Sequence, residues 1–247
     1  MLWLKEIANM FDYIILAQII SNEYLIIIAL ILIAVLLMFF SYYFSRKSRI
    51  LRKLNEFPYG KIQLCKDNDY IKIKGKASAL ASPLISPIGQ RKCVYYKIEV
   101  EEKRSSGKNR HWSTIIKEEK FQNFIIESQG EKALVVTEIP EGNKMTYLQK
   151  DVEYTSGTWN DPPEFLEHYL KSHGKKSAGF LGFNKSIRYK EGAIEIGEII
   201  TILGIGNWKE SDHNLDRYSS KSLYISGDSE NKLIITDDPK AQELKKK

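Results

Sequence analysis

The side chains in this sequence best suited to chemistry are one cysteine and a short run of carboxylates. Glu99, Glu101 and Glu102 are residues of the kind that carry out general acid–base catalysis, and Cys93 is a thiol that a neighbouring histidine would activate. The carboxylates lie beside Lys97 on an alternating strand, however, so a solvated charged face is the simpler interpretation. Cys93 falls on the same polar face and is expected to be a structural thiol.

Sequence motifs of catalysis and cofactor binding are missing. The chain has no GxxxxGKS/T phosphate loop, no GxGxxG after a strand and no GxSxG elbow. His168 and His173 lie near a predicted helix without a Cys or carboxylate cluster at metal spacing. We therefore expect no catalytic residue, no metal and no cofactor. The alternative is an enzyme whose site is assembled from sequence-distant residues, for instance Cys93 with a histidine.

The stretch Ala81–Lys103 predicts a turn-rich loop followed by a strand. Two Ser-Pro steps, Ser82-Pro83 and Ser86-Pro87, disfavour helix, and strict alternation begins after them. One face carries Val94, Tyr96, Ile98 and Val100, and the other carries Cys93, Tyr95, Lys97, Glu99 and Glu101. We expect the first face to be buried, and we predict Tyr95, Lys97 and Glu99 as a binding surface at an open sheet edge.

The polar segment 103–110 predicts a long basic loop at the tip of a β-hairpin, whose second strand carries Trp112, Thr114 and Ile116. Arg104 and Arg110 are candidate contacts there for an acidic partner or for lipid headgroups. A solvated loop without a binding role is the alternative.

Residues 24–44 contain no charge and predict a single membrane-spanning helix. Twenty-one residues at about 1.5 Å each span about 31 Å, enough for the hydrocarbon core. Tyr24, Tyr42 and Tyr43 suit the two interfaces, and a signal peptide would have a shorter apolar region. Residues 1–23 are either an amphipathic interfacial helix, an extracytoplasmic segment or a second membrane segment.

A basic cluster follows the predicted span. Its cations are candidates for binding anionic lipid headgroups, namely Arg46, Lys47, Arg49, Arg52 and Lys53. Since positive charge collects on the cytoplasmic side of a span, we expect a single-pass membrane protein with its C-terminal domain in the cytoplasm.

Composition is that of a globular domain of 247 residues, 43% hydrophobic and 11% aromatic, with a formal charge of +6. That charge is modest and no nucleic-acid signature accompanies it, so we expect no nucleic-acid partner. The two cysteines, Cys65 and Cys93, are too few for a disulfide scaffold.

Beyond a basic juxtamembrane linker over residues 45–60, short alternating strands predict a β-rich domain over residues 61–247. We expect a mainly β fold, a barrel or sandwich with one packed helix. Asp161 is the predicted cap of that helix, Pro162 its first residue, and Gly174 its end.

Several motifs resemble one known family. Their order is similar to that in the BAM domain, the domain beside the membrane in mitochondrial MULAN/GIDE-type ubiquitin ligases. The motifs are the Ser-Pro loop with Cys93-Val-Tyr-Tyr96, then Phe124-Ile-Ile126 with Leu134-Val-Val136, then Arg188–Gly197. Similar domains occur in membrane proteins of bacteria and archaea. The resemblance covers roughly residues 70–238.

Those ligases carry a RING that needs about eight Cys or His ligands, whereas this sequence has two Cys and four His. The resemblance therefore implies a RING-less member without ligase activity. We expect a non-catalytic module that binds another membrane-associated protein, or the membrane surface, beside the bilayer. A subunit of a ubiquitin-ligase-like system is a further alternative.

Overall fold

The computed structural model describes most of the chain, namely residues 24–106, 109–157, 160–178, 184–210 and 221–243. It divides into two compact units, and the second begins at Ile50 and contains all the described strands. In the first unit the apolar helix Tyr24–Phe44 is long enough to cross a membrane and leaves its side chains exposed. This confirms a candidate membrane span, while the predicted segment 1–23 lies outside the described residues.

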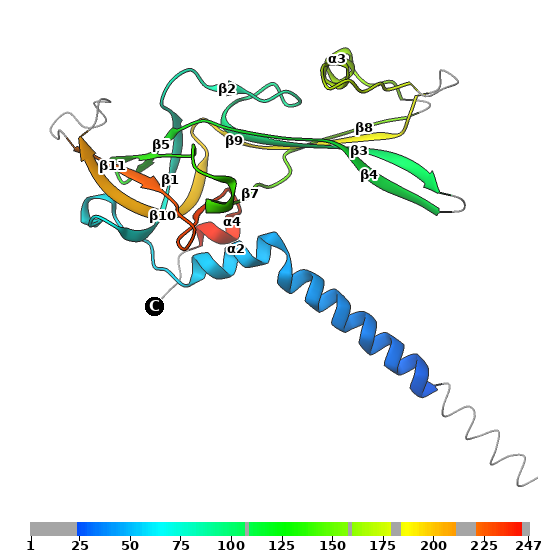
Figure 1. Ribbon diagram of the computed structural model, residues 1–247, viewed down its shortest axis with the longest axis horizontal. Helices are drawn as coiled ribbons and strands as arrows, with labels where there is room; N and C mark the ends of the chain where they lie inside the picture. The colour runs from blue at the N-terminus through cyan, green and yellow to red at the C-terminus, as the bar shows by residue number, and fades with distance from the viewer. Residues whose placement is uncertain (1–23, 107–108, 158–159, 179–183, 211–220, 244–247) are drawn as a thin grey trace, which may run out of the picture. The chain divides into compact units, whose positions relative to one another are not determined.

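Five strands of the second unit close into a barrel, in the order β1-β5-β6-β11-β10 and back to β1 (Figure 1). All neighbours are antiparallel except β6 and β11, which are parallel. This is the strand order of the OB-fold Greek-key barrel. The strands are β1 Asp69–Ala79, β5 Phe124–Ser128, β6 Glu131–Val135, β10 Ile199–Glu210 and β11 Lys221–Ser226, and the sheet continues from β10 into β12 Leu233–Thr236 and β7 Lys144–Tyr147.

Alternation along β1 separates the barrel interior from its surface. Ile71 and Ile73 join the buried core, whereas the lysines between and after them belong to the opposite face. Gly75 stands where β1 passes close to β5, because a Cβ there would lie 2.4 Å from the carbonyl oxygen of Glu127. The period-2 alternation along β1 therefore reflects a barrel whose interior is filled by side chains.

A second sheet is built around β3, with β2 and β4 on one side and β9 and then β8 on the other. All pairings are antiparallel, and the sheet forms a half-barrel beside the closed one. The structure is thus mainly β, as predicted. The strands are β2 Leu84–Ile85, β3 Lys92–Ser106, β4 Asn109–Phe121, β8 Val152–Ser156 and β9 Ile187–Glu195.

The predicted packed helix is α3 (Glu164–Ser172), which covers one face of the second sheet (Figure 1). Leu166, Tyr169 and Leu170 are its buried residues and join a core with side chains of β3, β4 and β9. Gly174, at φ +67°, follows its end as predicted. Asp161 does not cap the helix. The residue that precedes the helix is Pro163, and the Asp161 carboxylate instead accepts a hydrogen bond from the side-chain amide of Asn184.

Residues 45–60 were predicted as a linker, but most of them are folded. Arg46–Asn55 forms helix α2, and its apolar residues Ile50 and Leu54 are buried against Leu203 and Ile234. The folded β unit therefore starts at Ile50 rather than at residue 61. The remaining short helices are the 3₁₀ turns Ile62–Leu64 and Glu141–Asn143 and helix α4, Pro239–Gln242.

Asp237, just after β12, ties the barrel to the chain leading into the second sheet. Both carboxylate oxygens accept from the backbone N–H of Gln149, at 2.9 and 3.0 Å. Burial raises the pKa of Asp237 to about 7. The hydrogen bond from Gln149 lowers this pKa, and the nearby charge of Glu198 raises it further. The folded state therefore binds a proton at Asp237 more tightly than the unfolded state does.

This raised pKa predicts a pH-dependent stability. The contribution of Asp237 is complete below the unfolded pKa near 4 and is lost as pH rises through about 7, with a slope of at most about 1.4 kcal/mol per pH unit. Between pH 5 and 8 the unfolding free energy of the wild type should fall by about 2–3 kcal/mol more than that of Asp237→Asn. Urea denaturation followed by tryptophan fluorescence measures this, and parallel pH profiles would contradict it.

Candidate functional site

Tyr95 was predicted to be a surface binding residue, and the structure shows that this is wrong. Its side chain is fully buried in the barrel core, and its ring stacks on Phe121 with a centroid distance of 3.8 Å. Its hydroxyl donates to Glu119 at 2.5 Å and lies 2.9 Å from the Thr146 hydroxyl. Tyr95 is therefore a packing residue.

The barrel covers this end of the polar face: Tyr95 lies on the same face as Lys97 and Glu99, and its side chain joins the barrel core. A β-bulge accounts instead for the positions of Cys93 and Val94. The register between β3 and β9 shifts between Cys93 and Tyr95, so Val94 and Tyr95 both face the barrel core. Cys93 and Tyr96 face the second core, under α3. Strict alternation holds from Tyr95 onward, and the two-face assignment from the sequence fails for Cys93 and Val94.

The predicted open edge is also wrong for β3, which lies between β4 and β9. Lys97 and Glu99 do lie on the partly exposed face opposite α3, as predicted. That face carries paired charges: Glu101 binds Arg188 at 2.6 Å and Lys190 at 2.7 Å. Since these charges already satisfy one another, the face is a weaker binding candidate than the sequence suggested.

Beyond the end of β9 the hairpin continues as a two-stranded ribbon, residues 103–106 and 109–112, which we call the arm. The last β3–β9 pair is Glu102 with Ile187, and the arm projects past it (Figure 1). The predicted loop over residues 103–110 is thus mostly strand, and Lys108 lies outside the described residues. The exposed cations of the arm are Lys103, Arg104 and Arg110, with His111 beside them.

The base of the arm is fixed by aromatic and ionic contacts. The Arg188 guanidinium lies over the Trp112 ring at 4.5 Å, and Lys103 lies over the same ring at 5.8 Å. Glu102 binds Lys185 at 3.1 Å. The arm is therefore held where it leaves the sheet, and its outer residues face solvent.

The five cations predicted to meet lipid headgroups fall in helix α2 with different surroundings. Arg46 and Arg49 are exposed, whereas Lys47 and Arg52 are half-buried. The Lys53 ammonium binds Glu56 at 2.7 Å and lies over the ring of Phe57. Arg46 and Arg49 are the strongest headgroup candidates of the set.

Cys93 is fully buried, contrary to the prediction of a thiol on a polar face. Its Sγ lies 3.7 Å from the carbonyl oxygen of Leu84. Burial, together with the nearby charge of Glu191, raises the pKa of the Cys93 thiol to about 11. Since the thiolate is the nucleophilic form, this environment does not favour the alternative of a cysteine enzyme.

Sequence reasoning missed a polar cluster under α3. The Glu118 carboxylate accepts from the hydroxyls of Tyr96 and Tyr169, both at 2.6 Å, and lies 3.3 Å from Nε2 of His173. Burial alone would raise the pKa of Glu118, but the hydrogen bonds from Tyr169 and Tyr96 bring it below its ordinary value. The sequence did offer one signal for this cluster. Tyr96 and Tyr169 both fall on apolar faces, and a buried tyrosine hydroxyl needs a hydrogen-bond partner.

The Ser-Pro loop is held by a buried carboxylate that the sequence did not single out. Glu191 of β9 accepts from the backbone N–H groups of Ile88 and Gly89, at 2.8 and 3.0 Å. Arg91 binds Asp151 at 3.2 Å and also contacts Glu191. The contact joins two segments far apart in the sequence into one rigid unit.

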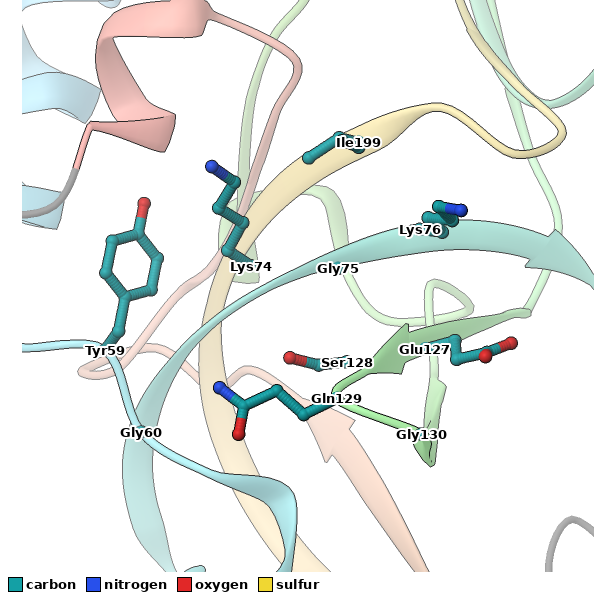
Figure 2. A pocket seen from close by; sticks show the side chains of 10 residues that line it. All are labelled: Tyr59, Gly60, Lys74, Gly75, Lys76, Glu127, Ser128, Gln129, Gly130 and Ile199. Atoms are coloured by element: carbon teal, nitrogen blue, oxygen red, sulfur yellow. The ribbon is translucent and has the colours of Figure 1, made fainter.

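A groove of about 420 Å³ lies on the barrel surface (Figure 2). Tyr59 and Gly60 form one side, β1 runs along it with Lys74 and Lys76, and the turn 127–130 forms the other side. Ile199 adds an apolar surface, and its side chain is 41% exposed. The volume is within the range of small-ligand sites.

Among the residues that the structure describes, no three His, Cys, Asp or Glu side chains are grouped to hold a metal. Comparisons with protein-family models, with curated proteins and with solved structures found no match. The fold and the sites define the class: a β-barrel domain with an attached half-barrel, preceded by a helix able to span a membrane.

The corrected position of Tyr95 makes a testable statement about stability. Tyr95→Ala should lower the unfolding free energy by about 3–5 kcal/mol, because it leaves a cavity beside Phe121. Tyr95→Phe keeps the ring and should cost about 1 kcal/mol for the lost hydrogen bonds. The exposed Arg110→Ala is the control, with a change within about 0.5 kcal/mol. Urea titration measures all three, and a wild-type value for Tyr95→Ala would restore the surface assignment.

Proposed function

We propose that this protein is a membrane-anchored, non-catalytic module that uses its arm to bind an acidic, extended segment of another membrane-associated protein. The observation that carries the proposal is the projection of the arm past the end of β9, with Lys103, Arg104 and Arg110 exposed on it. A two-stranded ribbon is marginal alone and adds little to a core. The ordered structure of the arm is therefore more simply explained by recognition of a partner than by a contribution to the stability of the fold.

Electrostatics support an acidic partner. The charges on the sheet face near Lys97 are largely paired within the chain, whereas Arg110 at the far end of the arm stands exposed. Surface cations of this kind raise association rates with anionic partners and become weaker as salt increases. In the described residues, neither strand of the arm pairs with a further strand on its outer side. Both outer edges could therefore accept an added strand from a partner.

Anchoring would explain how a modest binding surface suffices. A module held beside the bilayer by Tyr24–Phe44 is confined to a thin layer, which raises its effective concentration for other membrane proteins. Arg46 and Arg49 support an orientation with the β unit in the cytoplasm, where they would meet anionic headgroups.

The same proposal places the β unit in the BAM family of the MULAN/GIDE-type ligases, as a RING-less relative. The support is spatial: the Ser-Pro loop segment and the Arg188–Gly197 segment, which carry the resemblance, are adjacent through the β3–β9 pairing and the Glu191 hydrogen bonds. In those ligases this domain is the part thought to recognise partners. Buried Cys93 gives no comparable support to an enzyme.

The arm is tested by charge reversal. A photo-crosslinker placed at His111 should trap a discrete partner in native membranes, and Arg104→Glu with Arg110→Glu should reduce that adduct at least tenfold. Lys175→Glu with Lys176→Glu is the matched control, since it changes the same charge at exposed positions outside the arm. Adduct yield should also fall with added salt. Equal adducts from both double variants would contradict the proposal.

Orientation is tested by labelling. A cysteine introduced at the exposed position Lys176 should react with a membrane-impermeant maleimide only after the cells are opened, because the β unit faces the cytoplasm. Cys65 and Cys93 are buried and should label slowly in the folded protein. Labelling in intact cells would reverse the proposed topology.

A further inference from the structure

The groove on the barrel surface points to a second binding site, and we propose that it holds the phosphate headgroup of an anionic phospholipid. Lys74 and Lys76 supply the positive charge, while Tyr59 and Ile199 supply the apolar surface beside it (Figure 2). This site is separate from the arm. Of the proposed function, this second proposal depends only on the anchoring of the chain in a membrane by its apolar helix.

The cations of the groove come from one face of one strand. Lys72, Lys74 and Lys76 alternate along β1, so all three lie on the outer side of the barrel. Lys72 is buried, with its ammonium 2.8 Å from the carbonyl oxygen of Leu54 and 4.2 Å from the centroid of the Tyr59 ring. The Lys72 side chain is therefore held behind one wall of the groove.

The other two ammonium groups keep donors for a ligand. Among the described residues Lys74 gives one hydrogen bond, to the carbonyl oxygen of Gln242 at 3.1 Å, which leaves two of its three donors. Lys76 is exposed at the rim. Two ammonium groups two residues apart on a strand suit a phosphate, which accepts from several donors at once.

One carboxylate opposes this charge. Glu127 faces Lys76 across the β1–β5 pair and lines the far end of the groove from Tyr59 (Figure 2). It reduces the positive potential at that end. Removal of this charge should therefore strengthen anion binding, and this gives the test a variant with the opposite sign.

Chain length limits how far the groove can lie from the end of the apolar helix. Tyr59 follows Phe44 by fifteen residues, of which ten form helix α2. The helix spans about 15 Å and the other five residues at most about 17 Å, so Tyr59 lies within about 32 Å of the end of the apolar helix. This reach, the positive charge and the apolar surface together favour a lipid headgroup over a soluble anion.

The test uses the full chain in a nonionic detergent, titrated by calorimetry with dioctanoyl phosphatidylglycerol, dioctanoyl phosphatidylcholine and glycerol 3-phosphate. Phosphatidylglycerol should bind at least tenfold more tightly than either of the others. Lys76→Gln should weaken its binding about fivefold, as expected for one charge near an anionic headgroup, and Glu127→Gln should tighten it. Ile199→Trp, which fills the groove, should abolish binding, whereas Lys92→Gln, at an exposed position outside the groove, should leave it unchanged.

Equal affinity for phosphatidylcholine would overturn recognition of the anion. Equal affinity for glycerol 3-phosphate would overturn the lipid as the source of the phosphate. Wild-type affinity in Lys76→Gln, Glu127→Gln and Ile199→Trp, each with an unchanged circular dichroism spectrum, would remove the site from this groove. The arm variant Arg104→Glu with Arg110→Glu should keep lipid binding, so failure here is distinct from failure of the proposed partner binding.

Discussion

The structure depends on one strand that two cores bury from opposite sides. β3 presents Val94 and Tyr95 to the barrel, and Cys93, Tyr96 and Ile98 to the core under α3. Alternation sends Tyr95 and Tyr96 to opposite cores, and the bulge between Cys93 and Tyr95 turns Val94 to the barrel side as well. A change at this point would disturb both halves of the β unit, since the interior has little room to relax.

The same strand connects structure to the proposed function. Its first residues are fixed by the two cores, its middle residues by pairing to β4 and β9, and its last residues leave the sheet as the arm. The cost of ordering a projecting ribbon is thereby reduced, since its base is held by Trp112 and Arg188. A rigid base lets Arg104 and Arg110 present their charge at a defined distance from the core, which favours specific recognition over random contact.

Charge is distributed unevenly over the β unit. Around Glu101 and around Glu191, cations and carboxylates neutralise each other and hold strands and loops together. The arm and the groove, by contrast, carry exposed cations at Arg110 and Lys76. Paired charges on a folded surface add little net attraction for a partner, whereas exposed ones of a single sign do. The two proposed sites follow from this contrast.

The sequence by itself determined the features that local pattern controls: the apolar helix Tyr24–Phe44, the mainly β class and the end of α3 at Gly174. Each depends on neighbouring residues only, through hydropathy, alternation or backbone freedom. The tertiary structure alone decided that Tyr95 is core, that β3 is central, and that Glu118 and Glu191 are hydrogen-bond partners, the first half-buried and the second buried. The reason is physical: the residues that cover one face of a strand, and the strands that pair with it, come from segments far away in the chain, whereas alternation shows only which side chains share a face.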